Sequence, residues 1–437
     1  MSRIFRLFLL FILISACSLD KKSRIWSIDE KKRDKKDTNE FVVEELFKEE
    51  KKYNEEINLN VRIDLSSKLV DGNLPSNFTN NDKRINYDGQ LKTILKYKFS
   101  KIDNFNRFEP EVVFDKNNLI FFDNKGSILK YDKNSKLIWK KNYYKRSEKK
   151  LRPLLSMAIY KNYLLVVDNL AKYYAVDVAT GNLIWMKNNS APFNSQIKVY
   201  EDRIFVTDFK NILKCFSIYD GEEIWSVRTD NSFVKSQKKL SIILTKNVVI
   251  FNNTLGDISA VDINKGQLIW QTPTQDSSIF ESSFQLKTSD LIMSDKRILF
   301  SNNKNEFYSL DIKTGTLIWK KKINSSVKPI AMDNLVFTIS ENGFFIILDN
   351  KTGDIIRITN IFDKIKEKKR PQINPVGFLF GKKNIYLTTS NGRLIVIDVV
   401  TGKSNLILKI DNEKISRPFA AYKNLFIIKN NAILRLN

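Results

Sequence analysis

The chain has 437 residues, and its 73 basic and 49 acidic side chains give it a net charge of +24 at pH 7. It contains no histidine, which excludes Ser-His-Asp and Cys-His catalytic sets and removes the usual zinc and copper ligand. It also shows no CxxC pair, no glycine-rich phosphate loop and no calcium loop of alternating carboxylates. We therefore predict a protein that is not an enzyme and that needs no cofactor or metal.

Residues 1–16 predict a lipoprotein signal peptide. Arg3 and Arg6 precede a short apolar run, which is followed by Ser15-Ala16-Cys17. This ending resembles the bacterial lipobox, so we expect Cys17 to become the lipidated first residue, carrying palmitate-type acyl chains. The alternative is an ordinary export signal with an incidental cysteine. Because Ser18 rather than aspartate follows, the resemblance implies an outer-membrane anchor that faces the periplasm of a Gram-negative bacterium.

Residues 17–60 predict a charged tether, because lysine, aspartate, glutamate and asparagine dominate them. A short amphipathic helix within residues 40–57 is one further expectation for this part. Residues 61–89 are polar and read as a lead-in segment to the folded domain at 90–437. The basic excess is scattered along the chain, which favours compositional bias of an AT-rich genome, with attraction to an anionic membrane as the alternative. Export argues against a nucleic-acid partner.

One short motif recurs along the chain, in the form of Val-Asp-Val-Ala-Thr-Gly-Asn-Leu-Ile-Trp at residues 176–185. Glycines of successive copies are 40, 45, 49, 38 and 49 residues apart, a period typical of four-stranded propeller blades. Each copy predicts a hairpin, in which aspartate accepts backbone hydrogen bonds and glycine supplies the positive φ of the turn. The copies have their turn glycine, or Ser135 in its place, at Ser135, Gly181, Gly221, Gly266, Gly315, Gly353 and Gly402.

The repeats predict an all-β fold consisting of a single eight-bladed β-propeller, with seven blades as the alternative. Three-strand units can be placed eight times between residues 108 and 437, but a fourth strand follows only seven of them. Residues 90–99 alternate apolar and polar side chains and precede the first unit, so we expect them to complete the last blade and close the ring. The tryptophans of the motif are expected to pack between neighbouring blades; these are Trp139, Trp185, Trp225, Trp270 and Trp319. Cys215 is expected to be a small buried side chain.

The Asp-x-x-Thr-Gly-x-x-Ile-Trp repeat resembles the quinoprotein-type, or PQQ-like, propeller repeat. Two groups carry it: PQQ-dependent dehydrogenases, and lipid-anchored scaffolds of the BamB type in the β-barrel assembly machinery (BAM complex) of the outer membrane. The dehydrogenases have a longer chain, an adjacent-cysteine disulfide and acidic calcium ligands, whereas this sequence has no such cysteines. The lipobox, the single ring and the closing strand resemble the BamB type over residues 90–437.

This resemblance implies a non-enzymatic scaffold that binds the periplasmic POTRA domains of a BamA-like pore protein and works with other assembly lipoproteins. The family's contact loops correspond loosely to residues 232–235 and 288–291, so Phe233, Lys235 and Asp290 are the candidate partner-binding residues. The alternatives are a PQQ-dependent dehydrogenase with an atypical site and an envelope propeller that binds polysaccharide or peptidoglycan.

Overall fold

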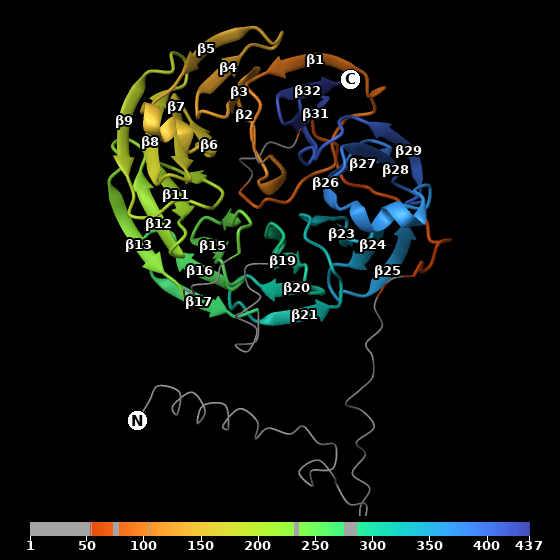
Figure 1. Ribbon diagram of the computed structural model, residues 1–437. Coiled ribbons are helices and arrows are strands. Elements are labelled where there is room, and N and C mark those ends of the chain that lie inside the picture. Colours follow the sequence, from red (N-terminus) through yellow and green to blue (C-terminus); the bar gives the residue numbers. More distant parts are fainter. Residues whose placement is uncertain (1–52, 54, 73–77, 104, 231–235, 275–285) are drawn as a thin grey trace, which may run out of the picture. The chain divides into compact units, whose positions relative to one another are not determined.

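The computed structural model describes residues 53–437 except 54, 73–77, 104, 231–235 and 275–285. The described residues form eight four-stranded antiparallel sheets, or blades, around a central axis (Figure 1). This arrangement confirms the predicted eight-bladed propeller and excludes the seven-bladed alternative. The predicted signal peptide with Cys17 and most of the predicted tether and helix lie outside the described residues.

Each blade runs from an inner strand near the axis to an outer strand at the rim. Blades 1 to 4 comprise β2 (Val113–Asp115), β3 (Asn118–Phe122), β4 (Ile128–Tyr131) and β5 (Leu137–Lys141); β6 (Leu155–Tyr160), β7 (Tyr163–Asp168), β8 (Lys172–Asp177) and β9 (Leu183–Asn188); β10 (Lys198–Tyr200), β11 (Arg203–Thr207), β12 (Ile212–Ser217) and β13 (Glu223–Arg228); and β14 (Ile242–Leu244), β15 (Val248–Asn252), β16 (Ile258–Asp262) and β17 (Leu268–Thr272).

Blades 5 to 8 follow the same plan, except that the outer strand of blade 8 is β1. They comprise β18 (Ile292–Ser294), β19 (Arg297–Asn302), β20 (Glu306–Asp311) and β21 (Leu317–Lys321); β22 (Ile330–Met332), β23 (Leu335–Ile339), β24 (Phe344–Asp349) and β25 (Ile355–Asn360); β26 (Pro375–Phe380), β27 (Asn384–Thr389), β28 (Arg393–Asp398) and β29 (Ser404–Lys409); and β30 (Phe419–Ala421), β31 (Asn424–Lys429), β32 (Ala432–Leu436) and β1 (Thr93–Lys98).

The ring is closed by β1, as predicted. This strand pairs antiparallel with β32, and Tyr97 lies opposite Ile433. Beyond the strand ends, Lys92 and Asn437 exchange both backbone hydrogen bonds, at 3.2 and 3.0 Å. Because β1 completes blade 8, the ring has no gap between its first and last blades. Closure therefore covers two sheet edges that would otherwise be prone to aggregation.

The core lies between the blades, where the two middle strands of each sheet bury both faces. In β3, for example, Leu119 to Phe122 are all buried, whereas the outer strand β5 exposes Leu137 and Ile138. Strands buried on both faces need continuous apolar runs, and the outer strand, with a single covered face, tolerates lysines. Cys215 is fully buried in β12, as expected.

At the seams between blades, the motif glycine lies directly beneath the tryptophan of the preceding blade. A β-carbon at Gly266 would lie 2.6 Å from the Trp225 ring, and the φ angle of Gly266 is +65°. The Trp225 indole donates a hydrogen bond to the Ile263 carbonyl at 3.3 Å, and the other four motif tryptophans make the corresponding bond. Ser135, which replaces glycine in the first copy, adopts φ +66°. In blade 6 the tryptophan is replaced by Arg357, which is fully buried and donates to the Val400 carbonyl.

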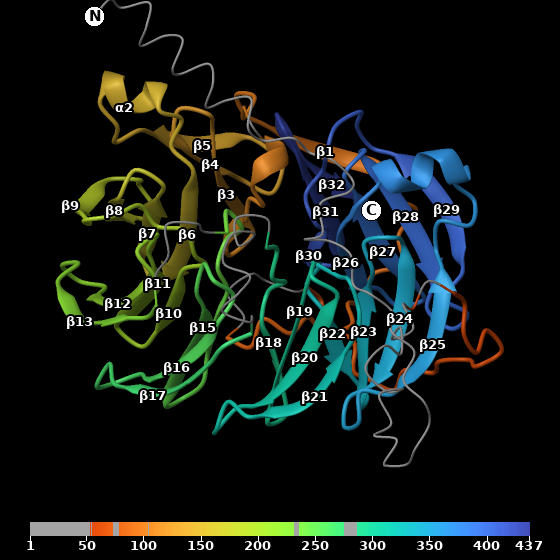
Figure 2. The same cartoon turned by 60° about the horizontal axis from the view of Figure 1, so that its bottom comes forward.

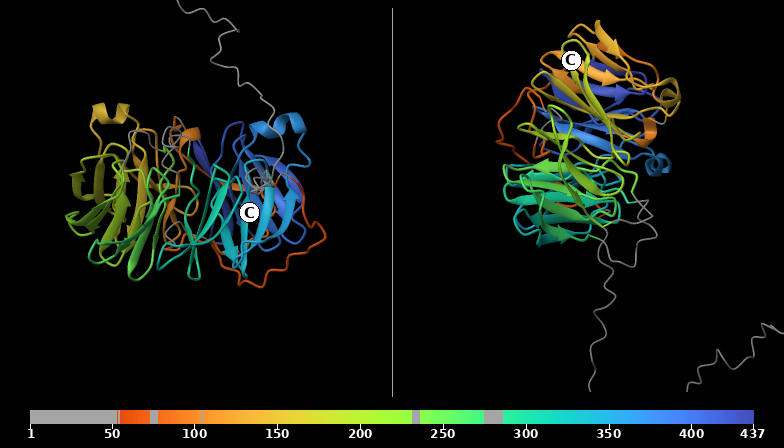
Figure 3. Two further views of the ribbon diagram at one scale, coloured as in Figure 1. Left: turned by 90° about the horizontal axis from the view of Figure 1, so that it is seen from below. Right: turned by 90° about the vertical axis from the view of Figure 1, so that its left-hand side faces the viewer.

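The ring has two faces, which we define by the connections they carry. On the loop face lie the connections from each outer strand to the next inner strand, including α2 (Arg146–Lys150) and η3 (Glu367–Gln372) (Figures 2 and 3). The 3-10 helix η1 (Phe105–Arg107) precedes blade 1. The motif turns lie on the opposite face, the turn face. No helix within the described ranges has the length and apolarity of a membrane span.

The segment before β1 docks along the turn face rather than standing apart from the ring (Figure 3). Ile57 pairs with Ile358 at the outer edge of β25 through two backbone hydrogen bonds, at 3.1 and 3.0 Å. Further along, the Val61 carbonyl accepts a hydrogen bond from Arg357, and Ser67 donates through its backbone N–H to Asp333 at 2.9 Å. A helix was expected over residues 40–57. The residues of this range that the structure describes, 53 and 55–57, are not helical.

Candidate functional site

A buried polar region lies at the ring axis, where residues 78–82 enter between the inner strands. We call this stretch the axial segment. The Asn80 amide donates to the side chains of Gln196 and Ser241 at 3.0 Å and to the carbonyls of Ile242 and Leu291 at 3.1 Å. These partners belong to blades 3, 4 and 5, so a single side chain connects three blades. Asn80 tolerates this position because asparagine adopts its φ of +54° more readily than most residues.

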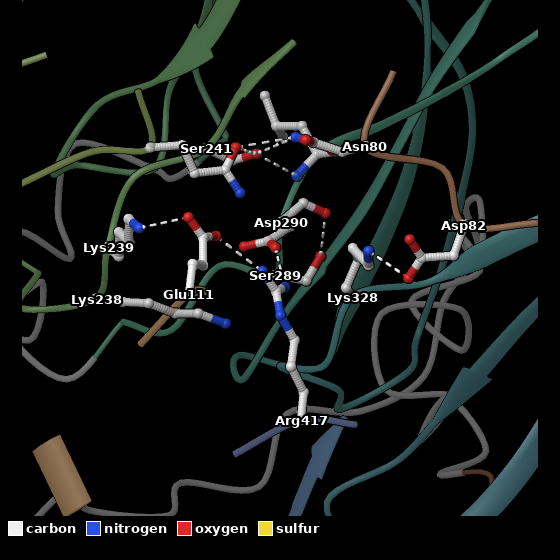
Figure 4. A network of polar contacts seen from close by, with 12 residues as sticks. Asn80, Asp82, Glu111, Lys238, Lys239, Ser241, Ser289, Asp290, Lys328 and Arg417 are labelled. Carbon is white, nitrogen blue, oxygen red and sulfur yellow. Dashed lines mark hydrogen bonds and ion pairs between the residues drawn. The ribbon is translucent and has the colours of Figure 1, made fainter. Parts of the chain in front are cut away.

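A network of ion pairs lies beside the axial segment (Figure 4). Arg417 contacts Asp290 at 2.5 Å and Glu111 at 2.9 Å, and Lys239 contacts the other oxygen of Glu111 at 2.9 Å. We call these four residues the axial ion network. They precede the inner strands β30, β18, β2 and β14, so the network joins four blades, some of which are not neighbours in the ring.

Both carboxylates of this network are held ionised. Burial by itself would raise the pKa of Asp290, but Arg417 and two nearby lysines outweigh it and bring the pKa well below its ordinary value. The same balance, with Lys239 and Arg417 as the cations, lowers the pKa of Glu111. Two carboxylates with depressed pKa values serve poorly as proton donors near neutral pH, so the network is suited to holding blades together rather than to general acid catalysis.

Two further lysines contact the axial segment. Lys198 donates to the Asn80 side-chain oxygen at 2.6 Å, and burial lowers its pKa to about 8. Lys328 forms an ion pair with Asp82 of the axial segment. Lys238 also lies beside this network, where its charge helps to lower the pKa of Asp290 (Figure 4).

The described residues contain no group of three or more histidine, cysteine, aspartate or glutamate side chains placed to hold a metal ion. The polar groups at the axis contact one another instead, through the bonds given above. This arrangement connects the inner ends of the blades to one another.

The residues predicted to bind a partner are only partly described. Asp290 is 7% exposed and forms the ion pair with Arg417, so its carboxylate is engaged within the ring. Phe233 and Lys235 lie outside the described residues, as does Cys17. A contact of Phe233, Lys235 or Asp290 with a partner therefore stays a prediction. The five motif tryptophans occupy the seams described above.

Sequence reasoning missed Asn80, Glu111 and Arg417, and the sequence carried a signal for Arg417 alone. A serine precedes the axis-facing residue in Ser195-Gln196, Ser289-Asp290 and Ser416-Arg417. In each pair the serine hydroxyl donates to the carbonyl of the next residue and accepts from a backbone N–H of the second strand, at 2.7 to 3.2 Å. This bracing turns the following side chain toward the axis, so a repeated serine before an inner strand marks axis-facing positions.

Comparisons with known proteins agree with this fold. Residues 124–359 match the model of a family described as outer membrane protein assembly factor BamB. Among solved structures, BamB from Moraxella catarrhalis superposes with a TM-score of 0.63 at 13% identity, covering 79% of this chain and 99% of that one. A europium-containing methanol dehydrogenase gives 0.64 at 10% identity, covering 82% and 89%. A quinohemoprotein alcohol dehydrogenase from Comamonas testosteroni gives 0.59 at 11%, covering 81% and 78%. At these identities the structures show a shared fold. No curated protein matches the sequence.

Proposed function

Because the chain belongs to the family of the outer membrane protein assembly factor BamB, we propose that it is a non-enzymatic scaffold lipoprotein of the BAM complex. In this proposal it binds the POTRA domains of a BamA-like pore protein, assists the insertion of outer-membrane proteins, and faces the periplasm from a lipid anchor at Cys17. The observation that carries the proposal is the family match over residues 124–359, which spans more than half of the chain.

The geometry of the ring supports a scaffold role. Asp290 precedes β18 and so belongs to an outer-to-inner connection of the loop face. Phe233 and Lys235 stand in the sequence between β13 and β14 and lie outside the described residues. Rigid loops on a preformed surface reduce the entropy that binding must overcome. We propose that residues 232–235 contact the partner directly, and that Asp290 acts by keeping its loop in place through Arg417.

Direct binding to purified POTRA domains of the organism's own BamA-like protein tests this proposal. We expect Phe233→Ala with Lys235→Ala to weaken binding at least tenfold, since interface side chains that matter cost more than about 1.4 kcal/mol on truncation. Lys313→Ala, an exposed lysine of a motif turn on the turn face, is the control and should leave affinity unchanged. No binding by the unaltered protein, or equal loss in the control, would contradict the proposal.

The lipid anchor needs its own test. We expect metabolic labelling with palmitate to mark the protein and Cys17→Ala to abolish the label together with fractionation into the outer membrane. Labelling that persists in the Cys17→Ala variant would place the acyl chain elsewhere and refute the lipobox interpretation.

One observation favours the dehydrogenase alternative. The methanol and alcohol dehydrogenases superpose on this chain with TM-scores similar to that of BamB. A titration separates the two functions. If the protein is a scaffold, adding PQQ and calcium to the purified chain leaves its absorbance unchanged and produces no dye reduction with alcohols or sugars. A saturable absorbance change with dye reduction would establish the enzyme.

A further inference from the structure

The seam between blades 7 and 8 differs from the tryptophan-filled seams. Leu406 of β29 lies opposite Val396, in the register that Trp225 has opposite Cys215 in blade 3. Blade 8 also has no motif turn, because its outer strand β1 comes from the N-terminal side of the ring instead of following β32. This seam therefore has neither an indole to fill it nor a turn glycine to receive one.

A cavity of about 500 Å³ opens along this seam. Its apolar lining includes the buried Ala432 and Leu434 of β32, together with Ile410 at the end of β29. The volume falls in the range of pockets that enclose small organic ligands. Because the lining comes from both blades, the cavity is a product of the ring closure by β1.

Lysines surround the cavity. Lys96 and Lys98 of β1 pair in register with Leu434 and Ala432, so their side chains stand on the face of β1 that is turned toward blade 7. Lys429 pairs in register with Ala432, so it stands on the same face of blade 8, and Lys409 borders the cavity at the end of β29. The equivalent outer strand of blade 2 is β9. Its face toward the preceding blade carries the apolar side chain of Met186 instead of lysines.

The positive charge at this cavity is largely uncompensated. Lys429 forms an ion pair with Asp411 at 2.6 Å. Lys96, Lys98 and Lys409 form no ion pair within the part of the chain that the structure describes. The ammonium groups of Lys96 and Lys98, beside an apolar floor, attract a ligand with an anionic head and an apolar body, since each part of such a ligand meets matching surface.

We propose that the cavity at the seam between blades 7 and 8 is a binding site for a phosphate-headed amphiphile. Lys96 and Lys98 contact the phosphate, and a short alkyl portion lies against Ile410, Ala432 and Leu434. The same chemistry belongs to the head and first acyl carbons of an anionic phospholipid and to a soluble alkyl phosphate.

Equilibrium dialysis of radiolabelled hexyl phosphate tests the site, with the full-length protein in phosphatidylcholine nanodiscs and empty nanodiscs as the blank. We expect saturable binding of one hexyl phosphate per chain, tighter than that of inorganic phosphate. Lys96→Gln with Lys98→Gln should weaken binding roughly tenfold, from two exposed charge contacts. The control, Lys313→Gln with Lys351→Gln, removes two exposed lysines from the turn face and should change nothing.

Nanodiscs that contain phosphatidylglycerol distinguish the two sources. If the natural occupant is a membrane lipid, phosphatidylglycerol competes for the site and the apparent affinity for hexyl phosphate falls. If the natural occupant is a soluble ligand, the affinity for hexyl phosphate is unchanged. Inorganic phosphate that binds as tightly as hexyl phosphate, or equal loss in both double variants, would overturn the proposal. Thermal melting of each variant shows whether a lost signal reflects unfolding, which is not expected because Lys96 and Lys98 are exposed.

Discussion

Arg417 provides the sharpest test of the idea that the axial ion network holds the blades together. Its guanidinium contacts Asp290 at 2.5 Å and Glu111 at 2.9 Å, and the side chains of the two acids are only 10% and 13% exposed. Arg417→Met keeps most of the side-chain volume but leaves Asp290 with no ion pair among those described and Glu111 with Lys239 alone. Breaking a buried ion pair from one side costs about 3–5 kcal/mol, so we expect the free energy of unfolding to fall by roughly that amount.

Urea unfolding followed by tryptophan fluorescence at pH 7 measures the loss. The control is Arg152→Met, since Arg152 forms a surface ion pair with Asp103 at 3.2 Å, with its own side chain 53% exposed. Removing such a pair costs less than about 1 kcal/mol. Adding Asp290→Asn to Arg417→Met should restore part of the stability, because no unpaired charge remains at that position. If Arg417→Met loses no more than Arg152→Met, the network does not stabilise the ring.

The pH dependence of this difference has a defined sign. The pKa values of Asp290 and Glu111 are lower in the folded protein than in the unfolded chain. Their stabilisation is therefore fully present above the unfolded values of about 4 and is lost as the pH falls through the lower folded values. The difference between the unaltered protein and Arg417→Met should be largest near pH 6–7 and should shrink below about pH 4. A difference that stays constant from pH 7 to pH 3 would contradict the assignment.

Three further predictions concern the seams, the axial segment and the thiol. Gly266→Ala should cost about 2–4 kcal/mol of unfolding free energy, because alanine at φ +65° is strained and its β-carbon would lie 2.6 Å from the Trp225 ring; a loss below 1 kcal/mol in urea unfolding would refute tight seam packing. Asn80→Ala should cost about 2–3 kcal/mol, because Lys198 and the Asn80 acceptors lose a buried partner, whereas Asn412→Ala on the surface should be neutral. Burial raises the pKa of Cys215 to about 12, so in a Cys17→Ser protein a thiol reagent should react only after denaturation.

The architecture could be predicted because the same short turn motif recurs in successive blades. Aspartate 177 and its equivalents accept the backbone N–H of a residue three positions on, and the following glycine adopts positive φ, so the turn is encoded within ten residues. Ring closure could be predicted from a missing strand. Such features depend on neighbours in sequence, and a single chain is enough to show them.

The axis could not be predicted in the same way, because its contacts join residues far apart in the chain. Arg417 meets Glu111 across 306 positions, and Asn80 meets Leu291 across 211. Residues 78–82 have neither the periodicity of a strand nor that of a helix, so their polarity indicated a lead-in segment. Their polar side chains instead satisfy buried groups of the inner strands, which is a tertiary property that local pattern does not carry.

The ring is held together at two places: β1 closes it at the rim, and the axial contacts join the blades at the centre. Blades of a propeller contact mainly their neighbours, so a ring held only at the rim by β1 would open at one seam. Arg417 and Asn80 add contacts across the axis, which couple blades that are not neighbours. A pull on the chain before residue 53 loads the contacts of the docked segment in chain order, from Tyr53 and the Glu56 and Ile57 hydrogen bonds with β25 to the Val61 contact with Arg357, before it reaches the axis. We therefore expect the outer contacts along the turn face to break before the axial contacts and β1 when tension is applied through the N-terminal segment.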